Sequence, residues 1–305
     1  MRRAYIDNNA TTPVLPPVLE AMQPYFGEQF GNASSIHHHG QQTRAAVEQA
    51  RESVAELLGA RPPEIVFTSG GTEADNLALF GLLGPGDHLI TSQVEHHAVL
   101  NAAKRLEGLG CEVTYLPVDG KGLIDLDLLR RSIRPNTRLI SIIFANNETG
   151  VIQPAAEIGR IAAEADLYFH TDAVQAAGKV PVDVKDIACD LLSISGHKIH
   201  APQGVGALFV RKGTLLQPML YAGATSVPAA PAPRTSPASW AWARRRNSRV
   251  PASTTAASSA FASCGTAWKP PFWRKSIRSA STGRERLAFP TPATSSSSAS
   301  KARPW

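Results

Sequence analysis

The sequence predicts an α/β fold with a mainly parallel sheet and helices on both faces. In residues 1–223, short runs of apolar and β-branched residues alternate with longer segments of helical periodicity. This order is expected of parallel strands joined by crossover helices. Polar, glycine-containing motifs directly follow several of these strands, at the edge where open α/β sheets bind ligands. With 305 residues, the chain is long enough for one large domain and a smaller companion.

Each expected element is bounded by turn residues or by a change of period. The strands are expected at Glu64–Thr68, His88–Ser92, Glu112–Leu116, Leu139–Ala145, Leu167–Thr171, Leu191–Ser195 and Val205–Val210. The helices are expected at Thr43–Leu58, Asn76–Leu83, His97–Leu109, Asp125–Ile133 and Pro154–Ala165.

Signals for secretion or membrane insertion do not occur in the sequence. No apolar run approaches twenty residues, and the first residues, MRRAYIDNNATTP, precede no apolar stretch. Cys111, Cys189 and Cys264 are too few and too scattered for a disulfide framework or a four-thiolate zinc site. We therefore predict a cytoplasmic protein with free thiols and no membrane partner.

The net charge of +6 arises from the C-terminal part of the chain. Residues 1–223 hold 18 Lys and Arg against 24 Asp and Glu, whereas residues 224–305 hold 13 against one. Ala, Ser, Pro and Thr fill 52 of these last 82 positions, and all five tryptophans fall there. Such a composition has neither helical nor strand periodicity and is not expected to bury a core.

Three interpretations of residues 224–305 are open: a basic tail that binds nucleic acid, a low-complexity linker, and translation out of frame after about codon 223. The third is favoured because it explains together the loss of acids, the loss of periodicity and the sudden tryptophans. The expected organisation is an N-terminal segment (1–14), a large domain (15–223) and a basic tail (224–305), disordered or out of frame. The small C-terminal domain would then be missing or malformed.

A glycine turn, Ser69-Gly70-Gly71-Thr72-Glu73, follows the first expected strand and opens a helix. Free backbone N–H groups and the positive end of the helix dipole suit such a turn to a phosphate. The alternative is an ordinary helix cap.

Polar residues also follow four later strands. Taken singly, Asp172 resembles a helix N-cap, Lys198 a solvated surface residue and His96 a capping histidine. The residues concerned are His96, Asn147, Asp172, Gln175, Ser195, His197 and Lys198.

The combination favours pyridoxal phosphate chemistry. A lysine can form a Schiff base with the cofactor aldehyde, and a carboxylate can keep the ring nitrogen protonated, which makes the ring an electron sink. Lys198 and Asp172 supply these two groups at neighbouring strand ends. His96 could stack on the ring and carry protons.

An ordered series of motifs from Tyr5 to about Gly223 resembles the cysteine desulfurases, which are fold-type-I pyridoxal phosphate enzymes of the class V aminotransferase-like group. The series reads YIDNNATTP, FGNASSIHHHG, EIVFTSGGTEADNLA, ITSQVEHHAVL, FANNETGVIQP, HTDAVQAAGKVPVD and SISGHKIHAPQGVGALFVR.

The resemblance implies a role for each matched residue. Lys198 would be the Schiff-base lysine, Asp172 would pair with the ring nitrogen, and His96 would stack on the ring. Gln175 would bond the cofactor's phenolic oxygen, and Asn147 would contact the substrate or the oxygen side of the cofactor. The phosphate would be held by Gly71, Thr72, Ser195 and His197.

The implied reaction converts L-cysteine to L-alanine and leaves the sulfur as a persulfide on an enzyme cysteine. The implied partners are a sulfur acceptor, such as an iron–sulfur scaffold or a tRNA thiolation pathway, and a second copy in a homodimer. No nucleic acid or metal is required. Other enzymes of the class, such as a selenocysteine lyase or an aminotransferase, remain alternatives.

The sequence departs from the family pattern after Gly223. The family's Gly-Thr motif is replaced by Ala224-Thr225-Ser226-Val227, and neither the nucleophilic cysteine loop nor the carboxylate-binding arginine has a counterpart. Cys264 lies too soon after Lys198 and in the wrong context, whereas Cys111 and Cys189 read as structural residues. An inactive remnant that only binds the cofactor is therefore a further alternative.

Two other classes fit the sequence poorly. His37, His38 and His39 are consecutive and cannot all face one ion, and no helix carries a ligand pair at i, i+4 with an acidic partner. A metallohydrolase is therefore disfavoured. A nucleotide-binding protein is excluded because no phosphate-binding P-loop or complete G-x-G-x-x-G follows a strand.

Overall fold

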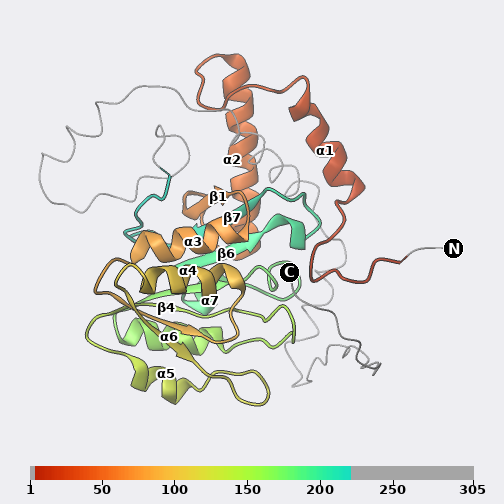
Figure 1. Ribbon diagram of the computed structural model, residues 1–305. Helices are drawn as coiled ribbons and strands as arrows, with labels where there is room; N and C mark the ends of the chain where they lie inside the picture. Colours follow the sequence, from red (N-terminus) through yellow and green to blue (C-terminus); the bar gives the residue numbers. More distant parts are fainter. Residues whose placement is uncertain (1–3, 221–305) are drawn as a thin grey trace, which may run out of the picture. The chain divides into compact units, whose positions relative to one another are not determined.

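The computed structural model describes residues 4–220 (Figure 1). The expectations for residues 224–305 and for a small C-terminal domain lie outside the described residues. No helix within residues 4–220 is long and apolar enough to cross a membrane. The cytoplasmic location remains a prediction.

Residues 4–220 contain a seven-stranded sheet in the order β1-β7-β6-β5-β4-β2-β3. Strands β6, β5, β4, β2 and β3 are mutually parallel, whereas β7 runs antiparallel to both β1 and β6. The mainly parallel sheet is therefore confirmed. The strands are β1 (Ile65–Thr68), β2 (His88–Ser92), β3 (Glu112–Leu116), β4 (Thr137–Ser141), β5 (Tyr168–Asp172), β6 (Leu191–Ser195) and β7 (Gly206–Val210).

Helices cover both faces of the sheet. Successive strand side chains point to opposite faces, so each strand packs against helices on both sides. Leu139 packs with helices α3 and α4, which lie side by side in Figure 1, whereas Ile140 packs in the larger cluster with α2 and α6. The helices are α1 (Pro16–Phe26), α2 (His38–Leu58), α3 (Gly71–Leu82), α4 (His97–Glu107), α5 (Leu126–Ser132), α6 (Ala155–Glu164) and α7 (Val184–Ile187), with short 3-10 turns η1 (Pro62–Glu64) and η2 (Gly196–Lys198).

Several boundaries differ from the sequence-based expectation. The strand expected at 139–145 ends at Ser141, although the N–H groups of Ile142 and Phe144 still donate to carbonyls of β5. This extension carries the chain from the sheet to Asn147. Helix α2 begins five residues earlier than expected, where His37 caps the N–H of Gly40. Helix α3 begins five residues earlier than expected, directly at Gly71.

The N-terminal segment is hydrogen-bonded to the turn after β6. The N–H and hydroxyl of Thr12 both donate to the carbonyl of His197, at 2.9 and 2.8 Å, and the N–H of His200 donates to the Thr12 hydroxyl at 2.8 Å. Thr12 is buried. Residues 7–12 therefore form one wall of the region around η2.

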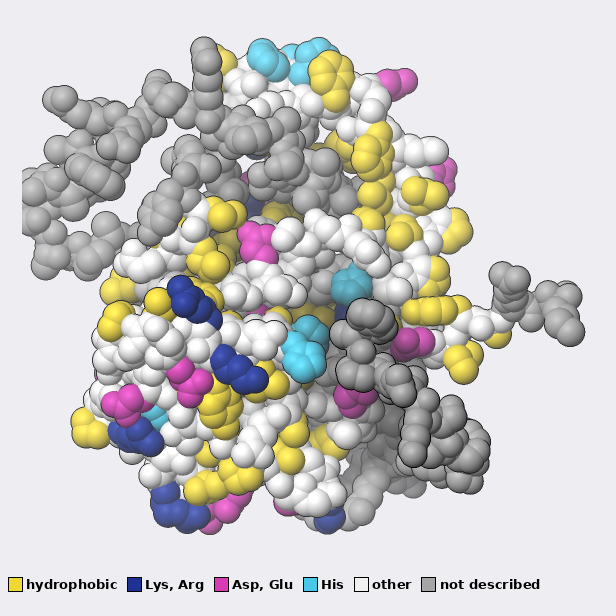
Figure 2. Space-filling view, viewed as in Figure 1, with side chains coloured by type: hydrophobic (Ala, Val, Ile, Leu, Met, Phe, Trp, Pro, Cys, Tyr) yellow, Lys and Arg dark blue, Asp and Glu magenta, His cyan; other side chains and the backbone are white. Residues whose placement is uncertain are grey.

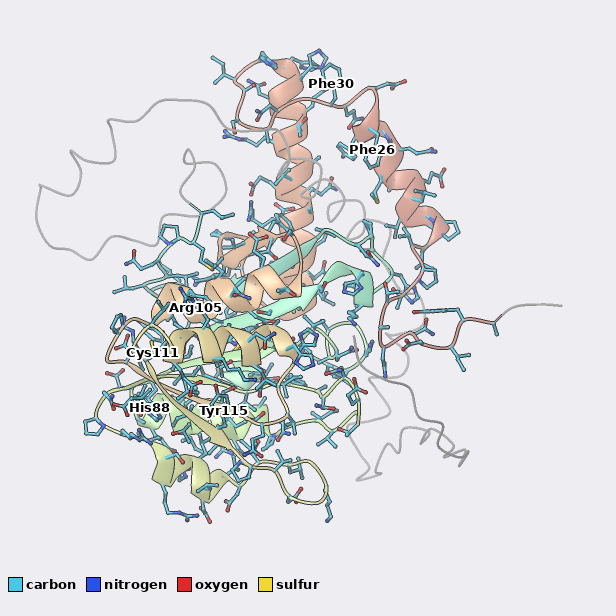
Figure 3. The ribbon with its side chains drawn as sticks, in the orientation of Figure 1. Phe26, Phe30, His88, Arg105, Cys111 and Tyr115 are labelled. Carbon is cyan, nitrogen blue, oxygen red and sulfur yellow. The ribbon has the colours of Figure 1, made fainter. Side chains whose placement is uncertain are left out.

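Large apolar side chains are exposed on α1 and on the chain segments around it. Ile6 and Ile36 are 90% and 91% exposed, and Phe26 and Phe30 are also exposed. Figure 2 shows hydrophobic side chains gathered over α1, and Figure 3 labels the two phenylalanines. Surfaces of this kind are typical of interfaces with other chains.

The close approach of β7 to the glycine turn gives a stability test. A Cβ on Gly206 would lie 2.6 and 2.7 Å from the carbonyl carbon and Cα of Gly70. We expect Gly206→Ala to lower the free energy of unfolding by about 1–3 kcal/mol, measured by urea denaturation of the full chain. Gly120→Ala, which meets nothing within 4 Å, should change it by no more than about 1 kcal/mol. Equal stabilities of the two variants would contradict the close packing.

Candidate active site

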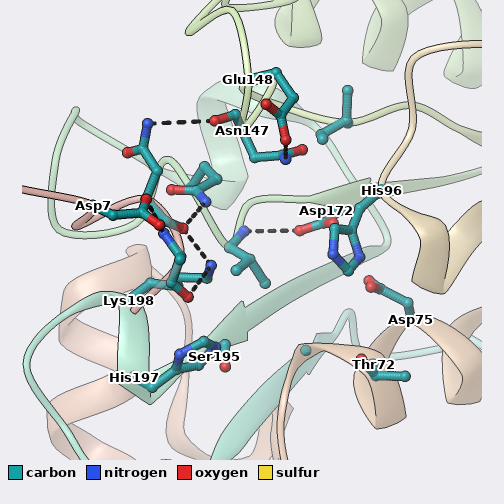
Figure 4. Close-up of a pocket in the computed structure, with 16 residues that line it drawn as sticks. Asp7, Thr72, Asp75, His96, Asn147, Glu148, Asp172, Ser195, His197 and Lys198 are labelled. Carbon is teal, nitrogen blue, oxygen red and sulfur yellow. Dashed lines mark hydrogen bonds between the residues drawn. The ribbon is translucent and has the colours of Figure 1, made fainter. Parts of the chain in front are cut away.

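A pocket of about 610 Å³ opens where the parallel strands end (Figure 4). All nine residues singled out from the sequence line it, together with seven others. The lining residues are Asp7, Asn9, Ala10, Gly71, Thr72, Asp75, His96, Ile143, Asn147, Glu148, Asp172, Val174, Gln175, Ser195, His197 and Lys198. The fold therefore brings the predicted residues together, and their individual roles remain predictions.

One end of the pocket is suited to an anion. Helix α3 starts at Gly71, so its first N–H groups have no partner within the helix and the positive end of its dipole meets the pocket. The hydroxyls of Thr72 and Ser195 line the same pocket. A Cβ on Gly71 would lie 2.8 Å from Val174 Cγ2, so glycine is needed for this turn to pack closely.

His197 lies between the anion end and the N-terminal segment. Its Nδ1 is 3.1 Å from the hydroxyl of Thr11. Partial burial and the charge of Lys198 lower the pKa of His197, so the ring is largely neutral at pH 7. A neutral imidazole can present one N–H to an anion without a buried charge.

Asp172 ends β5 with a buried carboxylate. Its Oδ1 accepts the N–H of Val174 at 2.9 Å. Burial raises the pKa of Asp172, and the opposing influences are this hydrogen bond and the charges of His96 and Lys198. Within residues 4–220, no ion pair is formed by Asp172, so its buried oxygen atoms suit a cationic ligand atom.

Lys198 ends the short turn η2, and its side chain points toward the N-terminal segment (Figure 4). The Nζ donates to the backbone carbonyls of Asn9 and Ala10, the latter at 2.8 Å. Partial burial lowers the pKa of Lys198, against the attraction of Asp172 and Asp7. A lowered pKa makes the nucleophilic free amine more accessible.

His96 and Asn147 approach the pocket from the ends of β2 and β4. His96 Nδ1 accepts the N–H of Ala98 at 3.1 Å and so caps α4, which leaves Nε2 as the other ring nitrogen. The capping interpretation is therefore confirmed, and the stacking role remains a prediction. Asn147 donates from Nδ2 to the Glu148 carboxylate at 2.9 Å and accepts at its backbone carbonyl from Asn9 Nδ2 at 3.4 Å.

Buried carboxyl groups behind the pocket were missed in the sequence. Asp75 lies on α3, lines the pocket and is 1% exposed, and Glu95 precedes His96 and is 6% exposed. Burial raises the pKa of Glu95 to about 8, and burial together with Asp172 raises the pKa of Asp75 well above its usual value. An acid on the apolar side of a helix was the available signal for Asp75.

A buried histidine of β5, His170, lies beside Asp75. His170 Nδ1 is 2.8 Å from the hydroxyl of Ser141, and its Nε2 is 3.0 Å from that of Ser193 and 3.6 Å from Asp75 Oδ1. Burial lowers the pKa of His170 to about 3. The ring is therefore neutral and adds no positive charge beside Asp75.

The cysteines at positions 111 and 189 are buried and lie outside the pocket lining. Cys111 donates to the carbonyl of Gly84 at 3.0 Å and lies across the view in Figure 3 from the N-terminal segment. Burial raises the pKa of Cys189 to about 12. Both thiols are poor nucleophiles. Cys264 lies outside the described residues, and within residues 4–220 no cluster of three or more His, Cys, Asp or Glu could hold a metal ion.

Comparison with known families identifies the group to which this pocket belongs. The model of the class V aminotransferases matches residues 4–238. The chain belongs to the class V aminotransferase family. The resemblance found in the sequence is thereby confirmed, and because enzymes of this class depend on pyridoxal phosphate, the predicted cofactor is confirmed at the level of the family.

The similar proteins of this family are named cysteine desulfurases. The chain is 54% identical over 226 residues to the cysteine desulfurase IscS of Dictyoglomus turgidum and 55% identical over 227 residues to that of Methanosarcina thermophila. Each alignment covers 73% of this chain. The chain spans 57% and 56% of the length of these relatives.

Solved structures show the same fold. A structure described as SspA in complex with cysteine superposes with a TM-score of 0.74 at 40% identity, covering 87% of this chain and 72% of that one. A NifS-like protein gives a TM-score of 0.74 at 34% identity, covering 87% and 70%. The predicted fold-type-I large domain is therefore confirmed.

The buried Glu95 predicts a stability that depends on pH. Between about pH 4.5 and 8, native Glu95 holds a proton that the unfolded chain has lost, so its contribution to stability falls as the pH rises. Glu95→Gln keeps an acceptor for Ser92 and Ile143 and stays neutral. We expect the variant to gain on the wild type in unfolding free energy across this range, by up to a few kcal/mol.

Urea unfolding of both proteins at several pH values measures this gain. The exposed Glu52→Gln on α2 is the matched control and should follow the wild type. A constant difference between Glu95→Gln and the wild type at all pH values would contradict a protonated Glu95.

Proposed function

We propose that the described residues are the cofactor-binding part of a pyridoxal phosphate-dependent cysteine desulfurase. The observation that carries the proposal is the meeting of Lys198, Asp172 and the N-terminus of α3 in one pocket. The names of the similar proteins, and a similar structure described as a complex with cysteine, support L-cysteine as the substrate.

The residues present fit the cofactor. Pyridoxal phosphate brings an aldehyde, a protonatable ring nitrogen and a phosphate, and these correspond to the Lys198 amine, the buried Asp172 carboxylate and the free N–H groups of α3. Asp172 is buried without an ion pair within residues 4–220. A cationic ring nitrogen would supply the missing charge.

The chain's own residues would prepare the substrate. When bound, the cofactor supplies an electron sink for the bonds at the substrate Cα. Asp172 would hold a proton on the ring nitrogen, and Lys198, with its lowered pKa, would exchange protons with the substrate as a free amine. His96, which lines the pocket, has Nε2 available for proton transfer.

Sulfur transfer requires a thiol that residues 4–220 do not offer in accessible form, because Cys111 and Cys189 are buried. This observation favours a second candidate function, a protein that binds the cofactor without turnover.

An external sulfur acceptor, such as an iron–sulfur scaffold or a tRNA thiolation protein, and a cytoplasmic location belong to the proposal. A homodimer is also proposed, supported by the exposed apolar side chains around α1.

Lys198 gives the first test. We expect the full chain incubated with pyridoxal phosphate and borohydride to gain one pyridoxyl group, detected by mass spectrometry, and Lys198→Ala to gain none. Lys185→Ala, at an exposed lysine of α7, is the control and should react as the wild type. An unchanged adduct in Lys198→Ala would overturn the site assignment.

Product analysis separates the candidate functions. The cofactor-loaded full chain is given L-cysteine, L-selenocysteine or an amino acid with a keto acid, each with and without dithiothreitol as sulfur acceptor. L-Alanine formed from L-cysteine, with dithiothreitol increasing the yield, is the expected result. Preference for L-selenocysteine or for the keto acid would point to the other class V reactions, and no product at full cofactor occupancy would identify a binding protein.

A further inference from the structure

Lys179 forms a hydrogen bond at the edge of the pocket that the proposed mechanism does not use. The residue lies in the turn after β5, four positions beyond Gln175, and its Nζ donates to Gln175 Oε1 at 2.6 Å. On the other side of the amide, Gln175 Nε2 donates to the backbone carbonyl of Asn9 at 2.9 Å. Lys179 itself is outside the pocket lining, whereas Gln175 is part of it.

These two contacts fix which way the Gln175 amide faces. If the amide were turned over, its NH2 group would meet the Lys179 ammonium and its oxygen would meet the Asn9 carbonyl, so both contacts would become repulsive. An amide nitrogen carries two protons, and Asn9 takes one of them. The second remains for a ligand in the pocket, so Gln175 presents a donor there.

The charge of Lys179 also acts on the reactive amine. Lys198 Nζ and Gln175 Nε2 donate to the same carbonyl of Asn9, so only the Gln175 amide and this carbonyl stand between the two lysines. Partial burial and the positive charge of Lys198 lower the pKa of Lys179. Four other charged or titratable groups face Lys198 and its surroundings: Asp172 and Asp7 attract it, and His197 and His96 complete the set. The positive charge of Lys179 therefore disfavours protonation of Lys198, whereas the carboxylates of Asp172 and Asp7 favour it.

We propose that Lys179 is a positioning residue, which holds Gln175 as a hydrogen-bond donor toward an anionic oxygen of the bound cofactor. Its positive charge also disfavours protonation at Lys198. This inference rests on the proposed function. It is consistent with a glutamine at this place, because an amide can accept from Lys179 at its oxygen and donate its two protons to Asn9 and into the pocket.

The test compares Lys179→Met with Lys179→Arg in the full chain. Methionine keeps the length of the side chain without the donor or the charge, and arginine restores both. We expect Lys179→Met to weaken pyridoxal phosphate binding roughly tenfold, because one hydrogen bond to a charged oxygen is lost. Lys179→Arg should restore binding to within about threefold, by the same reasoning.

A spectroscopic readout separates this role from a merely structural one. With the cationic neighbour and the Gln175 donor lost, the protonated form of the lysine-bound cofactor becomes more stable. We therefore expect the pH midpoint of the cofactor's visible absorbance to rise by about 0.5–1 unit in Lys179→Met. Lys185→Met, at an exposed lysine of α7, is the matched control and should leave the midpoint unchanged.

The Gln175→Ala background divides the two parts of the effect. There, Lys179→Met should no longer change the affinity through the amide, while the shift of the midpoint through charge should persist. If the wild type binds the cofactor and Lys179→Met has the same affinity and midpoint, the inference is overturned and the proposed function stands. If the wild type forms no lysine adduct, the proposed function fails and the inference fails with it.

Discussion

Burial of the Asp172 carboxylate at the end of β5 sets the charge balance that the whole pocket must satisfy. Desolvation raises the pKa of Asp172, so the group needs a positive neighbour to remain ionised. Burial also raises the pKa of the acids behind it, of Glu95 to about 8 and of Asp75 well above its usual value, which disfavours a negative charge on either group. His170 stays neutral. The Asp172 carboxylate is thus left to face the ring nitrogen of the family's cofactor, which would carry one positive charge.

The backbone places Lys198 opposite that carboxylate. Strand β6 ends in the turn η2, and Thr12 ties this turn to the N-terminal segment through the carbonyl of His197. The carbonyls of Asn9 and Ala10 then hold the ammonium of Lys198. A segment from the start of the chain therefore helps to position a lysine almost two hundred residues later, and it shares with Gln175 the hydrogen bond at Asn9 that orients the amide.

Periodicity predicted most of the sheet, and the strand-end motifs together with the family resemblance predicted all nine pocket residues, because parallel strands bring their carboxyl ends to one edge. They did not predict α1, whose sequence PPVLEAMQPYF begins with two prolines and contains a third at Pro24. The start of α3 at Gly71 was also not predicted, because glycine is a weak helix former. The close packing of Gly71 against Val174, which favours glycine here, is seen only in the structure. The wall made by Asn9 and Ala10 uses backbone carbonyls, which carry no signature in the sequence.

The proposed site requires that Asp172 stay ionised by pairing with a protonated ring nitrogen. Nitrogen NMR of the full chain loaded with pyridoxal phosphate labelled with ¹⁵N in the ring tests it most directly. We expect the chemical shift of a protonated pyridine at pH 7 to 8, and a shift to the unprotonated value in Asp172→Ala. An unprotonated ring nitrogen in the wild-type protein over this range would contradict the pairing with Asp172.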